Sequence, residues 1–175
     1  YTRHQKAWRD RVADEAACEV VQVEADVVVP VETASNKAEF AARTLRPKVR
    51  KLWNTYLLPL PTINPKLDSL GLNLPGRDAT QIDTLLAELD LDRTVPPVPR
   101  FVGGAAPAAS LLDGFIADHL SRYDDNRNQP QNNYVSHMSK YLHFGQVSPV
   151  WLALRVRDAA GHPEGDRDSF LEELL

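Results

Sequence analysis

The sequence predicts two architectures in succession, an α/β portion followed by an all-α portion. Runs of valine that are typical of buried strands follow a charged helical segment near the N-terminus. A stretch rich in proline and glycine interrupts the chain, and amphipathic helical patterns fill the remainder. We therefore divide the 175 residues into an α/β part (1–58), an interdomain linker (59–107) and the start of a helical domain (108–175).

The α/β part is expected to contain one helix and two strands. Residues 2–17 place Trp8, Val12 and Ala16 at helical spacing among charged residues, which predicts a helix with one buried face. Residues 19–23 have the composition of a strand. Residues 27–31 form a continuous β-branched run, typical of a strand buried on both faces, and Pro30 marks its end or a bend. A helix followed by a buried strand favours a parallel sheet.

Residues 35–57 predict helical structure that a proline interrupts. Ser35 is placed to cap the first turn, and Pro47 is expected to break or bend the helix before helical spacing resumes. This segment also holds the most basic part of the chain. Its cations form either a solvated face with internal ion pairs, which we favour, or a patch for DNA phosphates or a neighbouring domain. They are Arg43, Arg46, Lys48, Arg50 and Lys51.

Proline and glycine punctuate residues 59–107, as expected of a linker that crosses a surface. One short helix is expected inside it, capped by Asp78 or Thr80 and carrying apolar residues from Ile82 to Leu89. Gly103 and Gly104 are expected to form the turn before the next helix, because no phosphate-loop motif follows them.

Helical patterns fill residues 108–175. Residues 108–123 form an amphipathic helix with Leu112, Phe115 and Leu120 on one side. Another helix is expected after Ser148, which is a good N-cap and precedes a proline suited to the first turn. The last helical pattern has no closing cap before Leu175, so we expect a fragment of a longer protein.

The most informative stretch is residues 134–148. Ser136 and Ser139 lie three residues apart, just before an apolar run, which is a pattern of helix starts. A serine hydroxyl satisfies free backbone amides there, and the positive end of the helix attracts anions. The stretch predicts a helix, a break at Gly145 and a second helix. Its hydroxyls suit a phosphate, but most serine pairs of this kind at helix starts are plain caps.

Three segments, in the same order, resemble the cryptochrome/photolyase family, and in particular its class II cyclobutane pyrimidine dimer photolyases. Residues 123–148 are similar to the flavin-phosphate segment of the family, and Tyr-Leu-His-Phe-Gly-Gln at 141–146 is the form seen in class II. Residues 26–48 and 170–174 resemble the same class. The resemblance implies the C-terminal end of a Rossmann-like antenna domain, followed by the first helices of the FAD-binding domain.

The resemblance also assigns roles to individual residues. It implies FAD contacts by Tyr123, Arg127, Ser136, Met138 and Ser139. The family usually has Leu-Ser-Pro where this chain has Met-Ser-Lys at 138–140. Methionine is a tolerable replacement for leucine, whereas the lysine removes a proline suited to an early helical turn and adds a cation that favours phosphate.

The implied reaction is light-driven repair of DNA. Reduced, excited FAD gives an electron to a pyrimidine dimer that is flipped out of the duplex, and the protein positions the cofactor against the base. The resemblance gives Glu173 the contact with the dimer carbonyls and makes Phe170 an apolar wall. The alternatives are a cryptochrome-like flavin photoreceptor and a non-catalytic helical interaction module.

Composition narrows the remaining classes. The net charge of −4 gives no general attraction to DNA, so nucleic acid would require a local basic patch. The single cysteine, Cys18, excludes an internal disulfide and suits a reducing compartment. No apolar run approaches the length of a membrane span, and no zinc-like ligand spacing occurs. We expect a cytoplasmic monomer without a metal.

Overall fold

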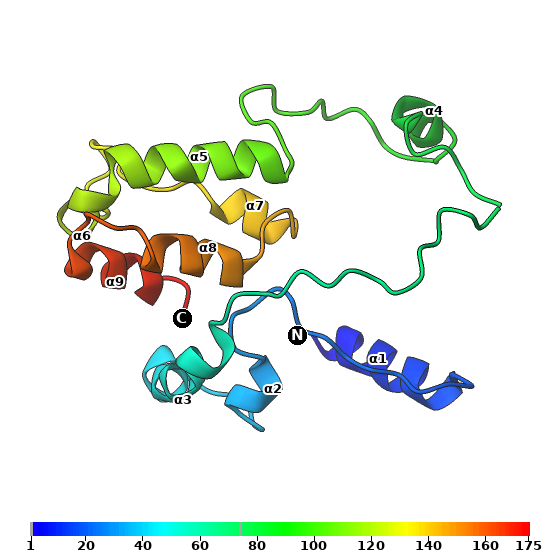
Figure 1. Ribbon diagram of the computed structural model, residues 1–175, viewed down its shortest axis with the longest axis horizontal. Coiled ribbons are helices and arrows are strands. Elements are labelled where there is room, and N and C mark those ends of the chain that lie inside the picture. The colour runs from blue at the N-terminus through cyan, green and yellow to red at the C-terminus, as the bar shows by residue number, and fades with distance from the viewer. Residues whose placement is uncertain (1, 74) are drawn as a thin grey trace.

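The computed structural model describes residues 2–73 and 75–175 (Figure 1). Its longer helices are α1 (Arg3–Glu15), α3 (Ala42–Tyr56), α5 (Ala105–Asp118), α8 (Pro149–Arg157) and α9 (Glu164–Glu172). The short elements are α2 (Val31–Ala34), α4 (Ile82–Ala87), the 3-10 turn η1 (Leu120–Arg122), α6 (Tyr123–Asn126) and α7 (Ser139–His143). None of the helices in this part of the chain is long and apolar enough to cross a bilayer.

The predicted α/β architecture is wrong, because residues 2–73 and 75–175 contain helices and no strand. Residues 19–30 have no regular structure, and Val31 begins α2. A strand needs a neighbour to satisfy its backbone N–H and C=O groups, and no such neighbour lies beside the valine runs. Val28 and Val29 are buried instead against Val49 and Leu57, in a cluster formed by helices. The predicted burial therefore holds for Val28 and Val29, without a Rossmann-like sheet, whereas Val31 and the valines of residues 19–23 are exposed.

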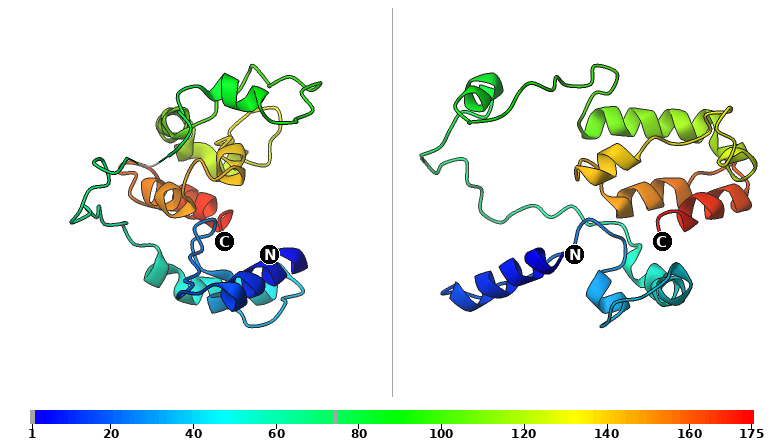
Figure 2. Two further views of the ribbon diagram at one scale, coloured as in Figure 1. Left: turned by 90° about the vertical axis from the view of Figure 1, so that its right-hand side faces the viewer. Right: turned by 180° about the vertical axis from the view of Figure 1, so that it is seen from behind.

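Helix α1 forms as expected, but the predicted buried face is wrong. Thr2 and Gln5 cap the helix reciprocally, with side-chain to backbone distances of 2.8 Å and 3.3 Å. None of its residues is buried; Trp8 is 66% exposed and Val12 is 58% exposed. The helix and residues 20–23 line a hollow of about 700 Å3. Figures 1 and 2 show α1 standing apart from the group formed by α5 to α9.

Helix α3 begins at Ala42 rather than near Ser35, and it continues through Pro47 instead of breaking there. Ser35 does not cap it, because its hydroxyl donates to Glu39 at 2.7 Å. The Lys48 ammonium lies 2.5 Å from the same carboxylate. Burial of Val49 and contacts of α3 with the rest of the chain therefore outweigh the hydrogen bond that a proline removes from a helix.

Helices α5, α7, α8 and α9 enclose the main core. Its buried residues include Leu112, Phe115, Leu120, Met138, Leu152, Val156 and Phe170. A second apolar cluster connects α3 to the group through Ala153 on α8 and through partly buried leucines at the end of α9. The chain between α3 and α5 is largely exposed and carries only the short helix α4 within its described part. Asp78 accepts hydrogen bonds from Thr80 and does not cap α4.

Candidate functional site

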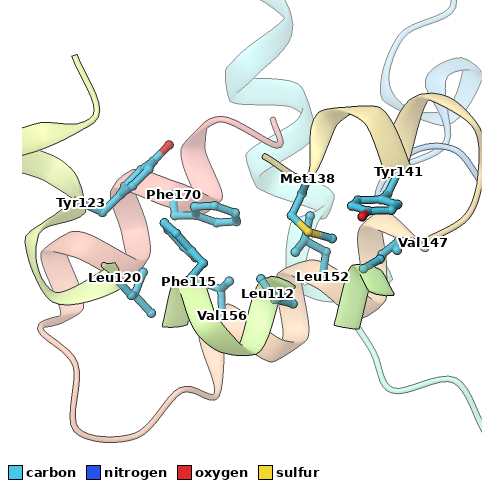
Figure 3. Close-up of a cluster of buried hydrophobic side chains, with 11 residues drawn as sticks. Leu112, Phe115, Leu120, Tyr123, Met138, Tyr141, Val147, Leu152, Val156 and Phe170 are labelled. Atoms are coloured by element: carbon cyan, nitrogen blue, oxygen red, sulfur yellow. The ribbon is translucent and has the colours of Figure 1, made fainter. Parts of the chain in front are cut away.

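Tyr123 lies at the start of α6 within a group of aromatic rings. Its ring makes edge-on contacts with Phe115 at 5.6 Å and with Phe170 at 5.3 Å between ring centroids. The Phe115 and Phe170 rings are themselves 5.3 Å apart. All three residues are buried, so the position of Tyr123 is determined by α5 and α9 together. Figure 3 shows the three rings side by side.

Arg127 and Glu173 form an ion pair beside this aromatic group. The Arg127 guanidinium donates to the Glu173 carboxylate and lies 3.8 Å from Asp124. Burial raises the pKa of Tyr123 above its usual value, the Glu173 charge adds to the rise, and the Arg127 charge opposes it. The structure thus brings together Tyr123, Arg127 and Glu173. The two partners of the ion pair, Arg127 and Glu173, are 46 residues apart in the sequence.

Two further contacts hold α6 against α9. The carboxylate of Asp166, which is buried, accepts a hydrogen bond from the Asp124 backbone N–H at 2.8 Å. The Ser169 hydroxyl donates to the Asp124 carboxylate at 2.6 Å. The sequence gives no signal for this role of Asp166, because an aspartate in the first turn of a helix is normally explained by the helix dipole alone. Its role depends on a segment 42 residues away.

The second part of the predicted site is the turn that leads into α7. Ser136 is half-buried and its hydroxyl accepts from the Met138 backbone N–H at 3.4 Å, while Met138 is the N-cap residue of α7. Neither serine therefore caps the helix as expected; Ser139 is its first residue and is exposed. Met138 is 1% exposed and fills the main core. His137, which lies between Ser136 and Met138 in the sequence and is exposed, has a left-handed backbone with φ of 55°.

The structure divides the predicted residues into two groups. Tyr123, Arg127 and Glu173 lie at one end of the main core, and Ser136 and Ser139 flank Met138 at another position on it. Figure 3 shows Phe170 and Phe115 between Tyr123 and Met138. The two groups share one core, so α5, α8 and α9 set their relative positions. Within residues 2–73 and 75–175, no group of three or more potential metal ligands occurs.

The end of the linker is fastened to the same region. The Tyr141 hydroxyl donates to the Val102 carbonyl at 2.9 Å, and the Gly104 N–H donates to the Gln146 side chain at 2.8 Å. Gly104 has a left-handed φ of 114° and precedes α5, which agrees with the predicted turn before a helix. Gln146 and Tyr141 hold this turn from about 40 residues further along the chain, so local sequence does not indicate the contacts, although both residues belong to the motif that carries the resemblance.

Carboxylates bind three of the five cations of the basic segment on α3. Arg46 and Arg50 both pair with Glu172 on α9, at 2.7 Å for Arg46, and Lys48 pairs with Glu39. This geometry favours internal ion pairs over a DNA-phosphate patch. It also fastens α3 to the end of α9.

A scan against models of protein families finds no match. The chain is nevertheless similar along its length to proteins named deoxyribodipyrimidine photo-lyase. It is 39% identical to the one from Methanothermobacter thermautotrophicus over 175 residues, which are 100% of the chain and 37% of that relative. It is 33% identical to the one from Arabidopsis thaliana over 171 residues, which are 94% of the chain and 34% of the relative.

The similarity extends to a third relative. The photo-lyase of Potorous tridactylus is 31% identical over 176 residues, which are 98% of the chain and 32% of that relative. The chain thus spans about a third of the length of the curated relatives it matches. Nearly the whole chain is therefore similar to a part of proteins that carry this name.

Proposed function

We propose that the protein repairs cyclobutane pyrimidine dimers in DNA with light, as a photolyase of class II, and that this chain supplies part of its FAD site. One observation carries the proposal. Tyr123, the Arg127–Glu173 ion pair and the Ser136–Ser139 turn are all held by the same main core. Similarity to proteins named deoxyribodipyrimidine photo-lyase supports the same activity.

The free polar groups fit a cofactor that carries a diphosphate. Arg127 Nε is buried and has no hydrogen-bond partner in the described part of the chain; it lies 3.8 Å from the Asp124 carboxylate, beyond hydrogen-bond distance, and another nitrogen of the guanidinium pairs with Glu173. A donor in this state costs free energy unless an acceptor binds to it. The Ser139 hydroxyl is exposed and adds a second donor. Phosphate oxygens are suitable acceptors for both groups.

Each proposed residue has a distinct task. FAD, when bound, supplies the electron that splits the dimer. Tyr123 covers the cofactor with a ring held by Phe115 and Phe170, and Ser136 and Ser139 donate hydrogen bonds to phosphate oxygens. Met138 anchors their turn in the core.

Two tasks are proposed for Glu173. The resemblance gives it the contact with the dimer carbonyls. Its ion pair with Arg127 supports a positioning role, in which the carboxylate orients the guanidinium toward the cofactor. Glu173→Gln separates the two tasks. Loss of dimer affinity with FAD retained supports the contact with the base, whereas loss of FAD supports the positioning role.

The proposal is tested by purifying the protein and measuring visible flavin absorbance and light-dependent reversal of a dimer in an oligonucleotide. Both signals are expected, and reversal must stop in the dark. Flavin absorbance without reversal supports the photoreceptor alternative. The absence of flavin from the protein, even after incubation with excess FAD, would contradict the proposal and favour a helical interaction module.

A further inference from the structure

A basic surface lies where the linker reaches α7. The Lys140 ammonium is 4.3 Å from the centroid of the Phe101 ring, and the Arg100 guanidinium carbon is 5.6 Å from the same centroid. The Phe101 side chain is 47% exposed, so one accessible aromatic ring carries two cations. The three residues come from segments 39 positions apart that the Tyr141–Val102 hydrogen bond joins.

This surface is held in place by both segments. The Tyr141 hydroxyl binds the Val102 carbonyl at 2.9 Å, and Gln146 binds the Gly104 N–H at 2.8 Å. A Cβ atom on Gly103 would lie 3.1 Å from the Gln146 side-chain nitrogen, so the linker approaches closely. The Lys140 ammonium also donates to the His137 carbonyl at 2.8 Å, which fixes its position beside the turn.

Carboxylates are absent from the two segments that form the surface. Residues 93–112 and 126–157 contain no aspartate or glutamate, although the whole chain has a net charge of −4. Within the described part of the chain, Arg100 and Lys140 form no ion pair. The α3 cations differ, because Arg46 and Arg50 are bound by Glu172. Among the described residues, Arg43 and Lys51 remain unpaired on α3, but they lack the aromatic ring and the neighbouring hydroxyl turn that accompany Arg100 and Lys140.

The electrostatic environment of His137 agrees with this. Burial lowers the pKa of His137 most, and the positive charges of Lys140 and Arg100 lower it further. His137 thus experiences both cations, which places them around the same turn that carries Ser136 and Ser139.

We propose that Arg100 and Lys140, arranged around the Phe101 ring and beside the turn at His137, form a binding site for a phosphate-bearing ligand. Charge-assisted hydrogen bonds from the two cations bind phosphate oxygens, and the exposed ring provides a stacking surface. The inference deepens the proposed function and rests on it only for the ligand's source. That source is either the FAD diphosphate or a phosphate of the DNA backbone.

The test compares the double variant Arg100→Ala/Lys140→Ala with the protein itself. The control is Arg43→Ala/Lys51→Ala, which removes two exposed cations of α3 and the same total charge. Binding of inorganic pyrophosphate, of FAD and of a DNA duplex at several salt concentrations is measured for each. Circular dichroism checks the fold. Arg100→Lys/Lys140→Arg retains both charges and should retain binding.

Pyrophosphate affinity is expected to fall at least tenfold in the double variant and to change little in the control. If FAD is the source, FAD affinity falls by a similar factor and DNA affinity is unchanged. If DNA is the source, the plot of log affinity against log salt becomes shallower in the double variant. The magnitude of its negative slope decreases by about 2, because two phosphate contacts are lost. Unchanged affinity for pyrophosphate, FAD and DNA would overturn the inference. Pyrophosphate binding that depends on Arg100 and Lys140, in a protein without flavin or repair activity, would retain this site and refute the proposed function.

Discussion

Replacing Tyr123 by phenylalanine separates its proposed contact with FAD from its role in the core. The ring is 7% exposed and packs on Phe115 and Phe170, and phenylalanine preserves both contacts. Within the described part of the chain the Tyr123 hydroxyl has no hydrogen-bond partner, so its loss removes nothing from the fold. We expect the free energy of unfolding to change by less than about 0.5 kcal/mol.

The cofactor should respond differently. If the Tyr123 hydroxyl binds FAD, Tyr123→Phe removes one hydrogen bond, which is about 1 kcal/mol or about a fivefold loss of affinity. Tyr123→Ala removes the ring as well and should reduce the free energy of unfolding by about 3–5 kcal/mol, as for other buried aromatic residues. Phe170→Leu is the matched control, because it perturbs the same aromatic group without touching the hydroxyl.

The measurements are urea unfolding followed by circular dichroism and titration of the apoprotein with FAD followed by fluorescence. A Tyr123→Phe protein that binds FAD as tightly as the parent would show that the hydroxyl does not contact the cofactor. One that is destabilised as much as Tyr123→Ala would show that the hydroxyl has a partner inside the protein. Either result would refute the reasoning given for this residue.

Three further predictions concern stability and charge. Glu172→Gln removes both arginine pairs of α3 and should reduce the free energy of unfolding by about 1–2 kcal/mol in urea, whereas Glu88→Gln in the exposed linker should cost less than about 0.5 kcal/mol. Hydrogen bonds from Lys48 and Ser35 lower the pKa of Glu39 from 4.5 to about 2, so the stability that this carboxylate contributes is lost as pH falls from 4.5 through about 2. In an acid titration, the free energy of unfolding should therefore decline less for Glu39→Gln than for the unchanged protein. The folded protein lowers the pKa of His137 below 6.5, so the unfolded chain binds that proton more readily and stability declines as pH falls below 6.5. Proton NMR should show the pKa of His137 rising in Lys140→Ala, and an unchanged value would contradict the assigned charge effect.

Local signals were read correctly from the sequence where the responsible partner is close along the chain. Ser148 accepts the Trp151 N–H and Pro149 occupies the first turn of α8, as serine followed by proline predicts. Gly145 ends the α7 segment with a φ of 62°. These features depend on three or four residues, so composition and spacing contain all the information that determines them.

The failures share a dependence on distant residues. The valine run at 27–31 has the composition of a buried strand, but a strand also requires a partner, and composition does not say whether one lies alongside. Pro47 was expected to break or bend a helix, yet α3 continues through it. The Arg50–Glu172 ion pair that helps to hold α3 joins residues 122 positions apart, so local sequence does not indicate it. In the site, the resemblance supplied Arg127 and Glu173 as separate functional residues. Their mutual ion pair follows only from the packing of α6 on α9.

The end of α9 illustrates how these distant contacts support the candidate site. Glu172 and Glu173 lie at the C-terminal end of a helix, where the helix dipole disfavours negative charge, and the last turn contains no basic residue. Arg46 and Arg50 from α3 neutralise Glu172, and Arg127 after α6 neutralises Glu173. Two segments that lie far apart in the sequence thus stabilise one helix end. Because the same helix carries Phe170 against Tyr123, the ion pairs of α3 contribute to holding the ring that we propose covers FAD.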